Sequence, residues 1–464
     1  MSDADGLSRV DLIAIIVELR RVNVLLAERV EVLEAEVERL RAGLPGGGSK
    51  VAPNWVKPNR KESREQERSA RKKRTQSFVR RREIPTEVHE HALEQCPKCG
   101  RNLCGGWVHR TRQYVEIPET PVRIVEHRMI RRKCGVCGRQ CMPKVDLSTE
   151  VLGKARVGVR LMSFIAYLHT VCRVPLRTIK GQLKLMYGLD LGLGELCRIL
   201  HSVSEAAKPE YAVLLEEIRG SPVVNADETG WREDGINGYI WSFSTPRVRY
   251  FVYRQSRSGQ VAKEVLSEEF EGVVVSDFYC GYSVLLTRHQ RCWVHFYRDL
   301  KKLVEAYPSD PSVGRWVDKV MSIYKQAKDF SSDEERSRVR QREIFEHALL
   351  EVARPYFKSD KPQRILAERI EKFLPELFVF VEDPRVPSEN NAAERAVRPC
   401  VIARKVSGGT RSAKGSVTKT VLMSLFGTWL VRGQDTMQMC RQMLISDNRR
   451  AYQATHKTIL SHAA

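Results

Sequence analysis

The chain has 464 residues, too many for one ordinary core, so about two to four folding units are expected. Hydrophobic residues make up 42% of it, and no apolar run reaches the ~18 residues of a membrane span, which excludes an integral helical membrane protein. The net charge of +21 favours a polyanionic partner, either nucleic acid or an anionic membrane surface. The N-terminus lacks a signal-peptide pattern, and we therefore expect a cytoplasmic, nucleoid-associated protein without a membrane partner.

Leucines at strict seven-residue spacing open the chain. Taking them as position d of a heptad puts three apolar residues and one asparagine at position a. Such a seam predicts a coiled coil over residues 1–44, and a single asparagine at position a is typical of a parallel dimer. The alternative is an amphipathic helix packed on a core. Position d is held by Leu12, Leu19, Leu26, Leu33 and Leu40, and position a by Ile16, Asn23, Val30 and Val37.

Residues 45–90 form a basic linker with few apolar side chains. Such a segment cannot build a core of its own. Its lysines and arginines would bind DNA phosphates without reading bases, although a solvated linker has the same composition. The candidate DNA-binding residues here are Arg71, Lys72, Lys73, Arg74, Arg80, Arg81 and Arg82.

Two CxxC pairs lie in residues 91–145. Cys96 and Cys99 belong to CPKCG, and Cys134 and Cys137 belong to CGVCG. Four thiolates form a closed tetrahedral shell for one structural Zn²⁺. We expect two strands between the pairs, over residues 114–117 and 122–130, as in a zinc ribbon. Cys104 and Cys141 are left over, either as substitute ligands or as ordinary buried thiols.

Residues 146–216 show apolar residues three and four apart, with breaks near Pro175 and Gly188. The pattern predicts short helices. A helix-turn-helix that binds DNA and a small helical bundle fit it equally well.

From residue 217 the pattern is that of an α/β domain. Strands are expected over 222–226, 239–244, 249–253, 272–276 and 291–296, with a helix over 260–270. Three meandering strands, a helix and further strands give the plan of a ribonuclease H-like fold with a mixed sheet. Asp227 and Asp277 each follow an apolar strand. Paired carboxylates favour a cation, and Mg²⁺ prefers such oxygen ligands.

A third carboxylate is Glu394, on a helix expected to start at Pro387-Ser388. Asn391 lies on the same face, and Arg395 and Arg398 beside it are candidates for gripping DNA phosphates. From the pattern alone, a surface helix with internal ion pairs is an equal alternative.

At these residues the sequence resembles the insertion-sequence-66 family of bacterial transposases. The most specific blocks are NADETGW at 225–231, SDFYCGY at 276–282, CWVHFYRDL at 292–300 and ENNAAERAVRP at 389–399. The resemblance implies that Asp227, Asp277 and Glu394 are the catalytic triad of a DDE transposase, holding two Mg²⁺ or Mn²⁺ ions. Glu389 stands where the family typically has aspartate. No role for His295 follows from the sequence.

The expected layout is multidomain α+β. It comprises the coiled coil, the basic linker, the zinc module, the helical segment, a catalytic domain over 217–430 with a helical insertion at about 301–385, and a helical tail over 431–464. Glycines and basic residues at 407–415 suit either an approach to DNA phosphates or a plain turn. The expected partners are terminal-repeat and target DNA, a second copy of the chain, and accessory proteins of the same element.

Two other functions fit parts of this pattern. A dimeric zinc and zipper regulator without catalysis would not need the carboxylate set. A ribonuclease H-like nuclease that cuts without joining would not need a zipper to pair DNA ends.

Overall fold

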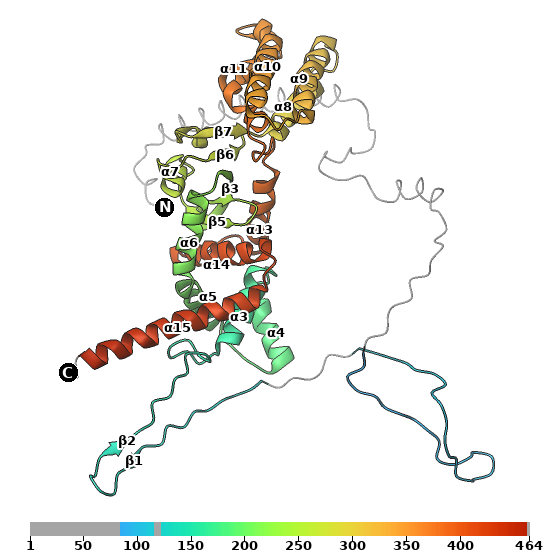
Figure 1. The fold of residues 1–464 in the computed structure, drawn as a ribbon, viewed down its shortest axis with the longest axis vertical. Helices are drawn as coiled ribbons and strands as arrows, with labels where there is room; N and C mark the ends of the chain where they lie inside the picture. Colours follow the sequence, from blue (N-terminus) through green and yellow to red (C-terminus); the bar gives the residue numbers. More distant parts are fainter. Residues whose placement is uncertain (1–83, 116–121, 462–464) are drawn as a thin grey trace, which may run out of the picture. The chain divides into compact units, whose positions relative to one another are not determined.

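A computed structural model describes residues 84–115 and 122–461 (Figure 1). The chain divides between residues 117 and 118 into two compact units, and each is described by itself. The expected coiled coil over 1–44 and the basic residues 71–82 lie outside the described residues. In the described ranges, no helix is both long and apolar enough to cross a membrane.

The region between the cysteine pairs differs from its prediction. Residues 122–130 have no regular secondary structure, and neither have residues 114 and 115, so the strands expected there are wrong over the described residues. Apolar side chains such as Ile124 and Ile130 are exposed, so no core holds a strand in place. The short strands β1 (Arg132–Lys133) and β2 (Gln140–Cys141) pair instead around the second CxxC turn.

In the part of the chain that the structure describes, four helices precede the sheet: α3 (Val159–Thr170), α4 (Leu176–Tyr187), α5 (Leu193–Ala206) and α6 (Lys208–Arg219). The expected breaks are confirmed, and Gly188 ends α4 in the left-handed conformation that glycine adopts without strain. The buried face of α5, including Leu196 and Leu200, shares one hydrophobic core with the sheet. Helix α4 exposes Arg177 and Lys184, and Lys184 pairs with Asp190 at 3.6 Å.

The sheet has five strands in the order β5-β4-β3-β6-β7. Strands β3 (Val223–Glu233), β4 (Ile236–Ser244) and β5 (Arg249–Arg254) form the expected antiparallel meander. Helix α7 (Gln260–Leu266) then leads to β6 (Val273–Ser276) and β7 (Arg288–Arg291), which run parallel to β3. The mixed sheet predicted from the sequence is thus confirmed.

One strand assignment was wrong. Residues 291–296 are not a strand, because β7 ends at Arg291 and helix α8 (Trp293–Ala306) begins two residues later. The short apolar run RCWVHF is compatible with a strand as well as with a helix. Trp293, Phe296 and Leu300, spaced three and four apart, are all buried on one helix face. The 3-10 helix η1 (Cys280–Val284) occupies the turn between β6 and β7.

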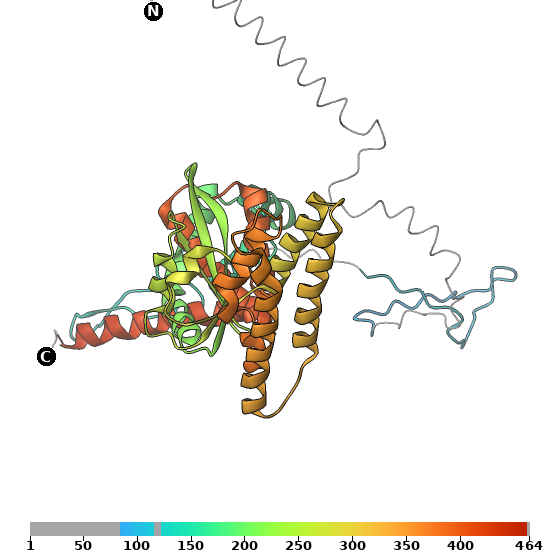
Figure 2. The same cartoon turned by 90° about the horizontal axis from the view of Figure 1, so that it is seen from above.

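The helical insertion predicted at 301–385 is present. It comprises α9 (Pro311–Asp329), α10 (Glu335–Ala353), η2 (Arg354–Tyr356), α11 (Arg364–Phe373), η3 (Leu374–Glu376) and α12 (Val379–Glu382). Helix α11 ends at Phe373, and Pro375 lies in the short 3-10 helix that follows it. The insertion and α8 build a second core around Trp293 and Phe378. Figure 2 shows the long helices of the insertion, coloured gold to orange, lying side by side.

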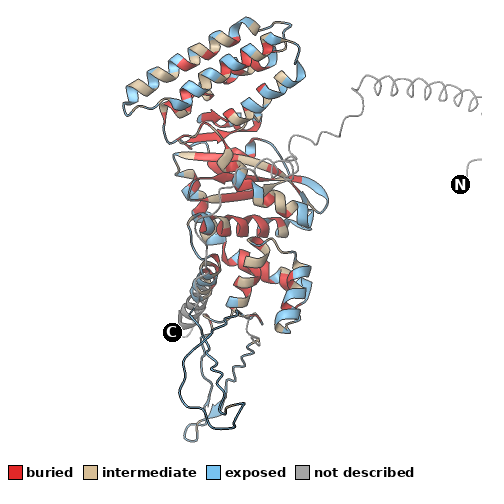
Figure 3. Cartoon of the chain, turned by 90° about the vertical axis from the view of Figure 1, so that its right-hand side faces the viewer, coloured by how far each residue is buried: buried red, intermediate tan, exposed pale blue. Residues whose placement is uncertain are grey.

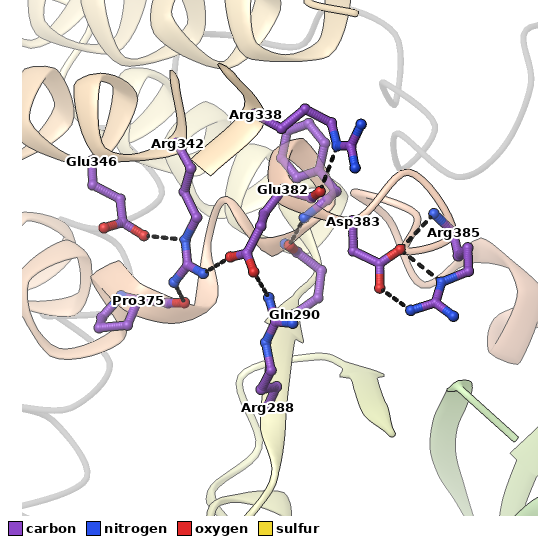
Figure 4. Close-up of polar contacts among 10 residues, drawn as sticks. Arg288, Gln290, Arg338, Arg342, Glu346, Pro375, Glu382, Asp383 and Arg385 are labelled. Atoms are coloured by element: carbon purple, nitrogen blue, oxygen red, sulfur yellow. Dashed lines mark hydrogen bonds and ion pairs between the residues drawn. The ribbon is translucent and has the colours of Figure 1, made fainter. Parts of the chain in front are cut away.

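Side chains fix the insertion to the outer strand β7 (Figure 4). Gln290 accepts a bond from the Phe380 N–H at 3.0 Å. Glu382 pairs with Arg288 at 2.8 Å and with Arg342 of α10. The insertion is therefore joined to the sheet through polar contacts as well as through its own core.

Three helices complete the chain: α13 (Asn391–Ser407), α14 (Ala413–Val431) and α15 (Thr436–Ser461). Helix α14 is buried along most of its length (Figure 3). Its hydroxyl side chains cover the free edge of β5. Thr428 Oγ1 accepts from the Arg249 N–H at 2.9 Å and donates to the Arg249 carbonyl at 3.2 Å, and Ser424 Oγ accepts from the Phe251 N–H at 2.8 Å.

The glycine-rich loop between α13 and α14 is bound to the end of β3. The Thr410 N–H donates to the Arg232 carbonyl at 2.8 Å, and the Thr410 carbonyl accepts from the Asp234 N–H at 2.8 Å. Gly409 has φ +130°, and a Cβ there would lie 2.1 Å from the Arg232 carbonyl oxygen. Close packing against β3 therefore requires this glycine.

Candidate active site

The three predicted carboxylates come from β3, β6 and α13. Asp227 lies within β3, two residues beyond Asn225, the last residue of β3 paired with β6. Asp277 follows the last residue of β6 directly. Glu394 lies in the first turn of α13, which packs on β3. Strand β3 does not end at Asp227 as expected. Its pairing with β6 stops after Asn225, and its pairing with β4 continues to Glu233.

Electrostatics tie these carboxylates together. The pKa of Asp227 is raised from 3.8 to about 7, mainly by burial and by the charge of Glu228, with smaller contributions from the charges of Asp277 and Glu394. A bond of 2.8 Å from the Glu228 N–H opposes that rise. Repulsion among carboxylates is what a bound cation would relieve. The oxygen-only donor set also suits Mg²⁺.

The side chains do not, however, converge into a compact metal-binding set. Among residues 84–115 and 122–461, no three His, Cys, Asp or Glu side chains are grouped so as to hold a metal ion. Glu394 is engaged elsewhere: its carboxylate pairs with Arg298 at 3.1 Å and lies 3.6 Å from His295 Nε2. Asp277 and Glu394 are thus close enough to Asp227 to raise its pKa, but the three described side chains do not form a group that could hold a metal ion.

A buried group of bonds fixes the start of α13 against β3. Asn390 donates to the Ala226 carbonyl at 2.8 Å and accepts from Asn225 Nδ2 at 3.0 Å. Its own N–H donates to Cys292 Sγ at 3.1 Å. We call Asn225, Asn390 and Cys292 the asparagine clamp. The helix begins at Asn391, later than the predicted start, and the Asn390 side chain binds β3 rather than capping the helix.

Arg291 holds the backbone of the second aspartate. This fully buried guanidinium donates to the Asp277 carbonyl at 2.9 Å and to Ser276 Oγ at 3.1 Å, and it pairs with Glu376 of the insertion. Arg291 was not among the predicted site residues. Its position at the start of the apolar run 291–296 was the available signal, because a buried charge needs partners.

A second acidic group lies beside Asp227. The Glu228 carboxylate is almost fully buried and accepts from Tyr282 Oη at 2.5 Å and from Arg257 at 2.6 Å. Arg257 in turn stacks over the Tyr279 ring at 4.0 Å. Glu228 belongs to the NADETGW block, and Tyr279 and Tyr282 belong to the SDFYCGY block, so these contacts link the two blocks beside the aspartates.

Arg395 and Arg398, the arginines predicted to grip DNA, are exposed on α13. An open cleft of about 470 Å³ lies further along β3, with Arg232, Tyr239 and Arg404 in its lining. Arg404 bonds the Gly230 carbonyl and so covers a strand edge that β6 leaves open. The site is therefore flanked by cationic side chains.

The two CxxC turns have the same local geometry, each within its own unit. The Cys96 N–H donates to the Arg101 carbonyl at 2.9 Å, and the Cys134 N–H donates to the Arg139 carbonyl at 2.8 Å. Gly100 and Gly138 have φ of +71° and +72°. Backbone N–H groups lower the pKa of Cys96 and of Cys134, which favours the thiolate that zinc binds. Cys104 and Cys141 are exposed rather than buried.

The mixed five-stranded sheet, with aspartates on two neighbouring strands and a glutamate on a helix packed against it, places this part of the chain in the mixed α/β class. Residues 154–418 match the profile of the transposase IS66 family, so the chain belongs to that family. It is 23% identical over 370 residues to the uncharacterized protein y4jD of Sinorhizobium fredii, covering 72% of this chain and 71% of that protein. The uncharacterized protein y4hP of the same organism is 22% identical over 414 residues, with 78% and 73% covered.

Proposed function

We propose that this chain binds the terminal repeats of its element and catalyses DNA cleavage and strand transfer, with Asp227, Asp277 and Glu394 as the catalytic carboxylates. The observation that carries the proposal is the raised pKa of Asp227, to which the charges of Asp277 and Glu394 both contribute. Family membership supports a transposase, and the strand order agrees with a ribonuclease H-like fold.

The three carboxylates would hold Mg²⁺ or Mn²⁺, two ions per site. Bound there, the ions would activate a water and stabilise charge on the attacking and leaving oxygens. In cleavage, water attacks the phosphorus and the 3′ oxygen leaves. In strand transfer, that 3′-hydroxyl attacks a target phosphodiester, whose own 3′ oxygen leaves.

The chain's own residues supply position and charge. Arg291 fixes the backbone at Asp277, and the asparagine clamp fixes the helix that carries Glu394. Arg395 and Arg398 are exposed on that helix and would hold DNA phosphates beside the site. The basic residues 71–82 would add contacts that do not depend on base sequence.

Single-turnover cleavage of a duplex containing the element's end, in Mg²⁺, tests the carboxylates. Glu394→Gln, Asp227→Asn and Asp277→Asn should each lower the rate by about 10³-fold or more, and double variants should add little. DNA affinity should persist, because it rests on Lys and Arg. Glu389→Gln is the matched control and should be milder.

A Glu394→Gln protein that cuts at near wild-type rate, while Glu389→Gln is inactive, would show that the wrong carboxylate was chosen. The same assay separates the alternatives. A regulator would bind the duplex without cutting it, and a plain nuclease would cut without joining the freed 3′ end to target DNA.

The cysteines serve a structural purpose in this proposal. Cys96, Cys99, Cys134 and Cys137 would hold one Zn²⁺ per chain, and the free energy of zinc binding would stabilise the module. The matching turns support this assignment. Metal analysis of the purified protein should find one zinc per chain, and finding none would refute it.

The N-terminal heptads would pair two chains so that two DNA ends are held together. Leu26→Pro would break such a helix at mid-seam, at a cost of about 3 kcal/mol or more. Paired-end complexes should disappear on native gels while DNA binding by single chains persists. Wild-type levels of paired ends in this variant would assign the pairing to another surface.

A further inference from the structure

Helix α8 directs two side chains at Glu394. Arg298 Nη2 lies 3.1 Å from one carboxylate oxygen of Glu394 and 3.4 Å from the other. His295, one turn earlier on α8, lies 3.6 Å from the first oxygen, and its Nε2 is 3.2 Å from Arg298 Nη1. Both oxygens that the proposed function assigns to a cation therefore already have a cationic partner.

This contact is built into the fold, because α8 and α13 start at a shared point. The Trp293 N–H at the start of α8 donates to the Ser388 carbonyl at 3.0 Å. The Asn390 N–H before α13 donates to Cys292 Sγ at 3.1 Å. With both helix starts fixed, Arg298 and Glu394 face each other across two rigid elements, 96 residues apart in sequence.

The same guanidinium is open to a second partner. About half of the Arg298 side chain is exposed, compared with about a third of Glu394. A guanidinium binds carboxylate and phosphate oxygens with the same planar geometry. Arg298 can therefore exchange a carboxylate for a phosphate without changing the kind of bond it makes.

We propose that Arg298 is a positioning residue that exchanges partners: it holds Glu394 until a divalent cation binds, and is then released to a DNA phosphate at the site. The inference rests on the proposed function of Glu394. It has a thermodynamic consequence. A cation that binds Glu394 frees Arg298 for a DNA phosphate, and a phosphate that binds Arg298 frees Glu394 for the cation. Cation binding and DNA binding therefore each strengthen the other by the same factor.

The exchange makes a prediction opposite to that of simple support. If Arg298 only held Glu394 in its working position, its removal would weaken cation binding. If Arg298 competes with the cation, its removal frees Glu394 and deletes a nearby positive charge, and cation binding becomes tighter. The direction of the change therefore decides between the two roles.

The test measures Mn²⁺ affinity of the full chain by the electron paramagnetic resonance signal of free Mn²⁺, with and without an end-containing duplex. For the wild type, the duplex should tighten Mn²⁺ binding. Arg298→Gln should bind Mn²⁺ more tightly without DNA, on the order of tenfold, and should gain little when DNA is added. Arg298→Lys keeps the charge and should fall between the two.

Glu394→Gln separates this inference from the proposed function. Loss of Mn²⁺ binding in Glu394→Gln, together with tighter binding in Arg298→Gln, supports the exchange. If Glu394→Gln loses Mn²⁺ but Arg298→Gln is unchanged or weaker, the exchange is wrong and the proposed function stands. If Glu394→Gln binds Mn²⁺ as the wild type does, Glu394 is not a ligand and the proposed triad itself fails.

Discussion

The cysteine turns and the carboxylate site are built over very different distances along the chain. Each cysteine turn closes with a bond across five residues, from Cys96 to Arg101 or from Cys134 to Arg139. The carboxylate site depends on the asparagine clamp, whose partners are 165 and 98 residues apart. A local turn can form wherever its few residues occur. The carboxylate site can form only once the sheet, α8 and α13 have packed. A substitution that disrupts a cysteine turn should therefore leave the carboxylate site intact, and the reverse should also hold.

The largest expected effect concerns Asp227 and pH. Burial and neighbouring charges raise its pKa to about 7, so between pH 4 and 7 the folded protein binds a proton that the unfolded chain has released. This stability is fully present below about pH 4 and is lost as pH rises through 7. In chelator at pH 8, Asp227→Asn should be the more stable protein by up to about 4 kcal/mol.

Urea unfolding from pH 4 to 8 measures this difference. The advantage of Asp227→Asn should shrink towards pH 4, where both side chains are neutral. Mg²⁺ at pH 8 should stabilise the wild type more than the variant, because a ligand that binds the folded state adds stability. Parallel pH curves for the two proteins would show that Asp227 does not titrate as the structure indicates.

The asparagine clamp gives the second effect. Asn390→Ala leaves the buried amide of Asn225 and the Ala226 carbonyl without their partner, which should cost about 2–3 kcal/mol in urea unfolding. Cleavage should fall as well, because the helix that carries Glu394 loses its anchor. Asn391→Ala, at the next and less buried position, is the control and should cost under about 1 kcal/mol. Equal losses in both variants would mean that the clamp does not fix α13.

Substitution of the cysteines should have the smallest effect on the stability of the sheet. Cys134→Ser should abolish zinc binding and increase hydrogen exchange around residues 132–141. The unfolding of the sheet should change by less than about 1 kcal/mol, because that turn is a local unit. Cys104→Ser should retain zinc. Loss of zinc in the Cys104 variant would make it a ligand, and a large loss of sheet stability in Cys134→Ser would end the contrast between the two regions.

The same contrast explains what the sequence could predict. Strands β3 to β6 and helix α7 follow from local periodicity, and the CxxC turns follow from spacing. The run 291–296 was mistaken for a strand, because a short apolar run fits both conformations until its packing partners are known. The bond between Asn225 and Asn390 joins residues that one sequence gives no reason to pair. Arg298 was likewise outside every predicted site, although it lies in the CWVHFYRDL block.

The covered edge of β5 has a consequence for how copies of this protein can meet. An outer strand with unpaired amides and carbonyls is a template on which another chain can add a strand. Here Thr428 and Ser424 of α14 bond Arg249 and the Phe251 N–H, and Tyr211 Oη donates to the Phe251 carbonyl at 2.6 Å. The outward backbone groups of Arg249 and Phe251 are thus all paired within the chain. Two copies cannot join by extending the sheet at this position, and any partner must bind through helices, loops or DNA instead.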